Sequence, residues 1–269
     1  MTAQVSNNRP PPLSHSKSQF DSWWLLVAGV IGLIVLLALI IPNPFTRIWE
    51  FVRDGLIVTV STTVIAFLCV LIVGLVGGLG RIARNPLIRL IASLYVEIVR
   101  GIPLLVQLLF WYFAFPAVVQ RLGFWLNIEP FKRYLADPVT MAIIGLAFCY
   151  GAYMSEVYRA GIQSISRGQM EAARSLGMTY FQAMRHVILP QAVRVILPPV
   201  GNEFISLLKD SSLVSVVAVP DITLRGRQFM ATSMLAIETW LMVGLLYLSL
   251  TLFSTRVVTW IERRTKLER

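Results

Sequence analysis

A group of polar residues lies inside an otherwise apolar segment near residue 200. Asn202, Ser206 and Lys209 recur at i, i+4 and i+7, which places them on one helix face, and Glu203 is adjacent. Polar groups inside membrane spans are costly and often mark solute pathways. An acid, an amide and an ammonium together suit a small solute that carries both charges, as amino acids do. Alternatively, Asn202 could bond two helices together and Lys209 could pair with Asp210 at the interface.

Two further features bear on this candidate pathway. Pro198 and Pro199 precede the polar face and are expected to break the helix, freeing backbone groups to line a cavity. Gln107 lies in another apolar segment, where it either faces the pathway or bonds to a neighbouring helix. Charged pairs at i, i+3, such as Glu97 with Arg100, have the spacing of helix-surface ion pairs.

The sequence contains no recognisable catalytic machinery. A phosphate-cradling G-x-x-x-x-G-K-[ST] motif is absent, and His15 and His186 stand isolated outside the apolar segments. Cys69 and Cys149 lie inside apolar segments, where they are expected to act as small hydrophobes. We therefore expect no cofactor or metal to be bound by this chain, and no ATP hydrolysis by it.

The composition is that of a membrane protein. Of the 269 residues, 56% are hydrophobic and only 14% are charged. Lys and Arg number 24 against 14 Asp and Glu, but no basic run is interleaved with aromatic residues, so nucleic acid is not expected as a partner. The basic residues fall between apolar segments, where anionic lipid headgroups of the bilayer explain them better.

The apolar segments predict an all-α integral membrane protein with about six transmembrane helices. These are residues 25–41, 57–79, 102–119, 139–158, 187–208 and 235–258. Residues 87–100 are too short to cross alone and are expected to form a cytoplasmic or interfacial lead-in, separated from the third span by a kink at residues 101–103. Residues 213–220 are also too short, and could be re-entrant only if protein shields them.

The ends of the chain differ from its centre. Residues 1–22 are polar and Pro-rich, which predicts a disordered tail, and residues 261–269 form a basic tail. The first span, within residues 23–42, is short enough to resemble a signal-peptide core, but no A-x-A-like site follows it, which favours its retention. Lys and Arg are more numerous on the side that holds both tails, so both termini are predicted to be cytoplasmic.

A polar segment, residues 166–190, interrupts the apolar pattern on the same predicted side. Ser166 with Gln169, and Thr179 with Gln182, have capping-box spacing. Gly177 stands between them, where a helix end favours a left-handed residue. These signals predict a short helix at 167–176, a glycine turn and a second helix from 180. The thin apolar face of the first helix, formed by Met170, Ala173 and Leu176, suits either packing on its own helix ends or docking to a cytoplasmic protein.

The polar segment resembles the EAA loop of permease subunits of ATP-binding cassette importers, whose pattern is E-A-A-x3-G-x9-I-x-L-P. This chain has Glu171, Ala172, Ala173, Gly177, Leu189 and Pro190 at the matching positions, with Val187 in place of the isoleucine. Three other stretches are similar to the polar amino acid branch of that family: VRGIPLLVQLLFWY at 99–112, SEVYRAGIQSISRGQ at 155–169 and LLKDSSLVSVV at 207–217. The resemblance covers residues 55–260.

This resemblance implies a type I importer in the bacterial inner membrane, with a five-helix core at residues 55–260 and one additional N-terminal helix. Its expected partners are ATPase subunits that use ATP and Mg, a second permease subunit, an extracytoplasmic solute-binding protein and an amino acid. Glu171, Ala172, Ala173 and Gly177 would form a coupling helix on the ATPase, where a bulky residue should disrupt docking by overpacking.

Two other functions remain open from the residues themselves. An ion-gradient-driven secondary transporter would be expected to show paired inverted repeats, and no convincing internal repeat is present. A channel for small polar solutes would need no cytoplasmic docking helix. Copurification of a separate ATPase distinguishes both alternatives from the importer.

Overall fold

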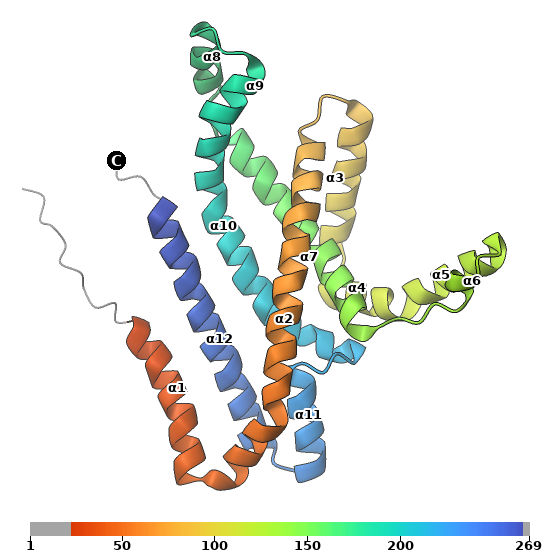
Figure 1. Ribbon diagram of the computed structural model, residues 1–269, viewed down its shortest axis with the longest axis vertical. Helices are drawn as coiled ribbons and strands as arrows, with labels where there is room; N and C mark the ends of the chain where they lie inside the picture. Colours follow the sequence, from red (N-terminus) through yellow and green to blue (C-terminus); the bar gives the residue numbers. More distant parts are fainter. Residues whose placement is uncertain (1–22, 266–269) are drawn as a thin grey trace, which may run out of the picture.

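The structure is a computed structural model that describes residues 23–265. Every regular element in this part of the chain is helical, as Figure 1 shows. Five helical segments are long and apolar enough to cross a membrane, and they are Trp23–Ile40, Pro42–Arg81, Leu104–Leu126, Pro138–Gln163 and Ala236–Arg264. The all-α membrane fold is therefore confirmed. The predicted tail at residues 1–22 lies outside the described residues.

Helix α1 (Trp23–Ile40) and helix α2 (Pro42–Arg81) form a hairpin with a very short connection. Asn43 has non-helical backbone angles and marks a kink near the start of α2, and the helical residues after it extend for about 57 Å. This is roughly twice the thickness of a bilayer core. Helix α2 therefore begins well before the predicted span at 57–79, and it is the central element against which other helices pack.

Helix α7 (Pro138–Gln163) packs directly on the glycine-rich part of α2. A Cβ atom added to Gly77 would lie 2.1 Å from Ser155 Oγ, and one added to Gly74 would lie 2.5 Å from Met154. Gly78 meets the α7 backbone at Ser155 O in the same way, at 2.9 Å. These glycines allow α2 and α7 to approach each other closely.

Helix α3 (Pro86–Gly101) corrects one expectation. It runs back alongside the end of α2, so that Gly80 faces Ala92 and a cavity between the two helices is lined by residues 72–80 and 88–95. These α2 residues belong to the predicted second span, so residues 87–100 are not an interfacial lead-in. The short length of the segment was misleading because α3 covers only part of the depth of the bundle.

The predicted break at residues 101–103 is confirmed. Helix α3 ends at Gly101, Ile102 is extended, and helix α4 (Leu104–Leu109) starts after Pro103. Beyond α4 the chain passes through a π-helical turn, η1 (Phe110–Ala114), into α5 (Phe115–Leu126) and α6 (Glu129–Lys132). Figure 1 shows α5 and α6 extending sideways from the bundle as an arm.

The second half of the chain carries the polar segment. It comprises α8 (Arg167–Ser175), α9 (Tyr180–Ala183), the π-helical turn η2 (Met184–Ile188), α10 (Leu189–Asp210), the 3-10 helix η3 (Ser211–Val217), α11 (Ile222–Ser233) and α12 (Ala236–Thr265). Helix α10 is the predicted fifth span, and its polar residues keep it out of the five most apolar helices. Helix α12 continues into the predicted C-terminal tail.

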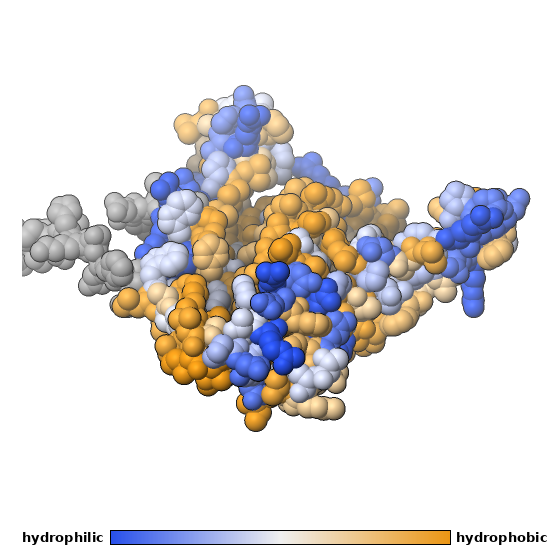
Figure 2. All heavy atoms as spheres, turned by 60° about the horizontal axis from the view of Figure 1, so that its bottom comes forward, coloured by the Kyte–Doolittle hydropathy of each residue, from blue (hydrophilic) through white to orange (hydrophobic). Residues whose placement is uncertain are grey.

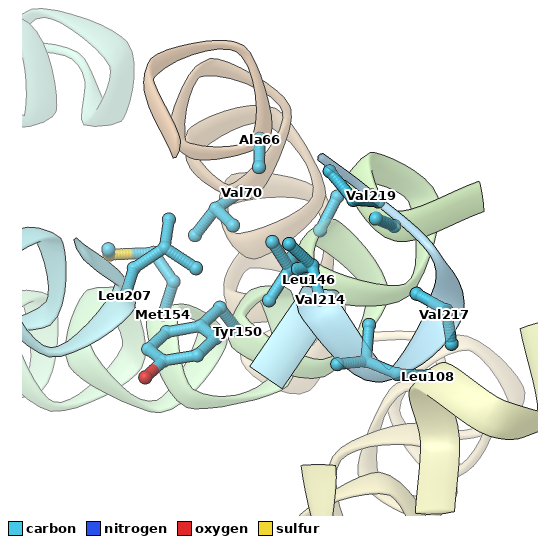
Figure 3. Packing of buried hydrophobic residues seen from close by; sticks show 12 residues of the cluster. Ala66, Val70, Leu108, Leu146, Tyr150, Met154, Leu207, Val214, Val217 and Val219 are labelled. Carbon is cyan, nitrogen blue, oxygen red and sulfur yellow. The ribbon is translucent and has the colours of Figure 1, made fainter. Parts of the chain in front are cut away.

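The principal core joins α2, α7, α10 and η3. Figure 3 shows Val70, Met154 and Leu207 around Tyr150, with Leu146 and Val214 beside them. Within residues 213–220, Val214, Val217 and Val219 are fully buried, whereas Val216 and Ala218 are exposed, so protein shields one side of this segment. A backbone segment that does not cross the bilayer is tolerated at membrane depth where protein shields it.

The surface divides into apolar flanks and polar ends. Figure 2 shows hydrophilic residues gathered at the forward end of the molecule, on the α8–α9 tip and at the end of the α5–α6 arm, with hydrophobic residues between them. Figure 1 places the α2–α3 turn, α8 and the end of α12 toward the same end.

Candidate functional site

The polar segment at residues 166–190 folds as the sequence signals predict, and we call it the α8–α9 knob. Helix α8 ends in a Schellman motif: Met178 N donates to Ala173 O at 3.2 Å and Gly177 N to Arg174 O at 3.0 Å. Gly177 has φ +85°, which explains the glycine. A helix of nine residues is marginal alone in water, so these closing bonds matter.

Of the two predicted capping boxes, only one is complete. Gln182 N donates to Thr179 Oγ1 at 3.3 Å, and Thr179 N donates to Gln182 Oε1 at 2.8 Å. At the start of α8, Ser166 Oγ instead accepts from Gly168 N, and Gln169 accepts from Gln191 at 3.5 Å. The predicted box at Ser166 is therefore only a simple cap, because the Gln169 amide bonds to the following helix.

One part of the predicted apolar face of α8 packs against the chain, and the other part is exposed to solvent. Ala173 is 4% exposed and Met170 is half-buried, whereas Leu176 is 81% exposed. Phe181, at 71%, and Tyr180 are exposed beside it. Leu176 therefore does not pack against its own helix ends, which was one of the two alternatives for this face. The other alternative is docking to another protein. The tip presents large apolar side chains on a polar element, which is unusual unless another protein covers them.

The remaining residues of the matched pattern are also accessible. Glu171, Ala172 and Gly177 are exposed on the knob, and no heavy atom lies within 4 Å of a Cβ built on Gly177. Leu189 and Pro190 are exposed at the start of α10. Small residues with open space around them allow a partner to approach the backbone closely.

The knob contacts the α2–α3 turn, and it continues into α10 through the π-helical turn η2. The Arg84 guanidinium, from the α2–α3 turn, lies 5.8 Å over the Tyr180 ring. Pro190 removes the backbone donor that would bond to His186, and the preceding turn η2 is π-helical. The same arrangement recurs at Pro116, which follows η1. In both places the wider turn accommodates the proline within a continuing helix.

A shared carboxylate joins α2 and α7 just before the knob. Glu156 accepts from Arg81 on α2 and from Arg159 on its own helix, the latter through Nε at 3.0 Å. Arg159 also donates to Gln163 at the end of α7. The Glu156–Arg159 pair, which has i, i+3 spacing, is therefore part of an interhelical network.

The structure places the predicted pathway residues of α10 on one outward side. Asn202 and Lys209 are exposed, while Glu203 and Ser206 are half-buried. The two prolines do not break the helix, since α10 is continuous from Leu189 to Asp210 with both prolines inside it. A proline removes only its own donor, and the rest of the helical ladder is retained.

Gln107 lies apart from this face and has a clear local role. Its Nε2 donates to the carbonyls of Val99 and Ile102, each at 2.9 Å, and lies 3.4 Å from Cys149 Sγ. These carbonyls lie at the break before Pro103. The side chain therefore replaces backbone donors that the break removes, which favours the structural alternative over the pathway one.

A polar cluster that sequence reasoning missed lies behind the α10 face, and we call it the inner polar cluster (Arg100, Tyr150, Tyr153, Glu203 and Asp210). Tyr150 Oη donates to Asp210 Oδ2 at 2.7 Å. The Arg100 guanidinium lies 5.1 Å over the Tyr153 ring, and both Arg100 and Asp210 lie within electrostatic range of Glu203. Arg100 thus faces α7 and not Glu97. The sequence did contain a signal for this cluster, because Tyr150 and Tyr153 lie three residues apart within one apolar segment.

Comparisons with known proteins agree with these features. Residues 70–267 match the family described as "Binding-protein-dependent transport system inner membrane component". The glutamine transport system permease protein GlnP of Escherichia coli K12 is 33% identical over 226 residues, covering 83% of this chain and 98% of GlnP. The arginine transport system permease protein ArgU of Corynebacterium glutamicum is 33% identical over 233 residues, covering 83% and 73%.

A crystal structure of an amino acid ABC transporter with histidines is also similar. It has a TM-score of 0.72 and 36% sequence identity, and the match covers 81% of this chain and 96% of that one. The residues matched to the family begin within α2, at residue 70.

Proposed function

Because this chain belongs to the family of binding-protein-dependent transport system inner membrane components, we propose that it is the permease subunit of an ATP-driven importer that moves polar amino acids into the cytoplasm. The observation that carries the proposal is the α8–α9 knob. It has the E-A-A-x3-G pattern, and it presents Leu176, Tyr180 and Phe181 to the solvent on the end of the molecule that holds the basic turns.

On this proposal the knob docks on a separate ATPase. Ala172 and Gly177 allow backbone approach, Leu176 and Phe181 supply apolar contact, and Glu171 supplies a charge at the rim. Ala173 supports the knob from within, because it is buried against the chain. Leu189 and Pro190 connect the knob to α10, so that closure of the ATPase displaces the helix that carries the polar face.

The polar face of α10 lines the solute pathway in this proposal. Asn202 and Lys209 are exposed and Ser206 is half-buried, and this face would lie toward a second permease subunit across the pathway. Glu203 links this face to the inner polar cluster. An ammonium and a carboxylate on the solute would both find partners there. The relatives are named for different amino acids, so the identity of the solute is left to competition experiments.

The orientation and the partners complete the proposal. Both termini and the knob face the cytoplasm of a bacterial cell, where the ATPase subunits bind ATP and Mg. The opposite end of the bundle receives the solute from an extracytoplasmic binding protein. The second permease subunit is either a copy of this chain or a related one.

Uptake measurements test the function directly. Cells with and without this chain are supplied with labelled amino acids and unlabelled competitors, and the chain is purified to see whether an ATPase accompanies it. Ala172→Leu should abolish ATPase copurification and uptake without unfolding the chain, because Ala172 is exposed. Leu135→Trp, at an exposed site remote from the knob, is the matched control. Normal energised uptake without any ATPase would favour the secondary transporter or channel.

The pathway residues need a separate readout. Asn202→Ala and Glu203→Gln are expected to change the affinity or the order of preference among competing amino acids, while ATPase copurification stays normal. If affinity and selectivity both stay unchanged, these side chains have a structural role only.

A further inference from the structure

The α5–α6 arm carries a row of exposed apolar side chains. Val118, Leu122 and Trp125 recur at i, i+4 and i+7, which places them on one face of α5. All three side chains are exposed, and Trp125 is 82% exposed. We call these three residues the arm stripe. Large apolar side chains grouped on one helix face indicate an apolar partner.

The opposite face of α5 is covered by α6, which carries charged side chains. Gly123 on that face is buried, and a Cβ added to it would lie 2.5 Å from Lys132 N. Gln120 Nε2 donates to Tyr134 O at 2.8 Å, which closes the arm beyond α6. Lys132 pairs with Glu129 within α6. The arm therefore has an apolar side and a charged side, as an amphipathic element on a membrane surface has.

The connectivity places the arm on the side of the bilayer opposite the knob. The α2–α3 turn lies beside the knob, because Arg84 of this turn contacts Tyr180, and α7 ends at Gln163, just before the knob. The 26 residues of α7 extend for about 39 Å, which is enough to cross a bilayer core of about 30 Å. The start of α7 at Pro138 therefore lies at the opposite surface, and α6 ends only a few residues before it.

The helices before the arm are long enough to reach that surface without α5. Residues 86–114, which contain α3, α4 and η1, correspond to about 40 Å at the rise of a helix. The exposed rings of Phe110 and Phe113 on η1 continue the apolar surface of the bundle to the start of α5. Figure 1 shows α5 and α6 leaving the bundle sideways, as a helix in the plane of a membrane does.

A lipid surface fits these features better than a protein does. Tryptophan prefers the headgroup level of a bilayer, and Arg121, next to Leu122, can extend its guanidinium to the phosphates while its methylene groups stay in apolar surroundings. A water-soluble partner would approach the charged side of the arm, away from the arm stripe. We propose that the α5–α6 arm lies in the plane of the membrane on the side opposite the knob, with the arm stripe among the acyl chains and α6 toward water.

An arm held in this way fixes the depth of two membrane-crossing segments. Helix α5 continues directly from η1, and the segment after α6 leads into α7, which carries Tyr150 and Tyr153 of the inner polar cluster. The contacts of Gly123 and Gln120 hold the arm together as one compact unit. The membrane surface therefore keeps the end of η1 and the start of α7 at the same level.

Spin labels on the full-length chain test the proposal in liposomes of phosphatidylcholine and phosphatidylglycerol. Cys69 and Cys149 are first replaced by alanine. One cysteine is then introduced for labelling, either at a position of the arm stripe or at Glu129 or Arg133 on the charged side. Oxygen concentrates in the acyl region, and a nickel chelate stays in water. The ratio of the collision rates with oxygen and with the nickel chelate should be severalfold higher at all three positions of the arm stripe.

A charge in the arm stripe should reverse this result. Leu122→Glu, combined with a label at Trp125→Cys, should lower the collision ratio to the value found on the charged side, because a carboxylate is costly in the acyl region. Arg133→Glu is the matched control, because it introduces the same side chain beside α6 and should leave the ratio at Trp125→Cys unchanged. Both replaced side chains are exposed, so neither change creates a cavity in the packing.

Two reference labels set the scale of the collision ratio. Leu68→Cys, on an exposed face of α2, reports lipid, and Leu176→Cys, on the knob, reports water. Ratios at the arm stripe equal to that at Leu176→Cys would overturn the proposal. Low collision rates with both agents, together with restricted label motion, would also overturn it, because they would assign the arm stripe to contact with a second copy of this chain.

Discussion

Replacement of Gly177 should separate the stability of the α8–α9 knob from its docking. The residue has φ +85°, and nothing lies within 4 Å of a Cβ at this position. In the isolated chain, Gly177→Ala therefore costs only the backbone term, about 1 kcal/mol. Gly177→Asn should cost less, because asparagine tolerates the left-handed region. Gly177→Leu should cost about as much as alanine, since its side chain meets only open space.

Docking should distinguish these variants where stability does not. If an ATPase surface approaches the knob at Gly177, a leucine there overpacks the contact by about 1–3 kcal/mol, which corresponds to about 5- to 150-fold weaker association. Alanine and asparagine should be affected less.

The assay compares thermal unfolding of the purified chain with amino acid uptake by cells that carry each variant. Equal uptake by Gly177→Leu and Gly177→Ala would refute the reasoning, because it would mean that no partner surface covers this position. Unfolding of Gly177→Leu at far lower temperature than Gly177→Ala would also refute it, because the space would then not be open.

Three further predictions concern the packing that supports the site, each measured by thermal unfolding of the purified chain. Gly77→Ala should destabilise by about 1–3 kcal/mol, and Ser155→Gly should relieve part of this in the double variant, because Ser155 Oγ is the atom that a Cβ would strike; simple additivity would contradict it. Gln107→Leu should cost about 1–3 kcal/mol by removing the donor to Ile102 O at the helix break, while Val99 O keeps its bond from Ile102 N, and should leave solute affinity unchanged. Burial raises the pKa of Asp221, which caps α11, so Asp221→Asn should cost less than Asp221→Ala, for which about 2 kcal/mol is expected; an equal loss for both would count against this account.

Local signals predicted the knob well because they act over a few residues. Thr179 and Gln182 form the full box that their spacing indicates, and Gly177 takes the left-handed conformation that ends α8. The break at Pro103 was also foreseen, because a missing backbone donor has the same consequence wherever it occurs. These predictions needed no knowledge of the neighbouring helices.

Predictions that depended on tertiary contacts were less successful. Arg100 was assigned to Glu97 by spacing, but it lies over Tyr153 of α7, because the folded bundle offers an aromatic face there. Residues 87–100 were placed at the interface on length alone, although α3 packs along α2. The Tyr150–Asp210 bond joins residues that are 60 apart in sequence, and no local pattern reports such a pair.

The Glu156 carboxylate has a mechanical consequence for the helices that it joins. It is bonded to Arg81 and Arg159 together, a short distance before α7 ends and α8 begins. A push on the knob cannot move α7 alone unless charge-assisted bonds break. Together with the close contact between the α2 glycines and α7, these bonds hold α2 and α7 as one rigid unit. If an ATPase docks on the knob as proposed, its movement would therefore be transmitted along α2 toward the opposite side of the bilayer.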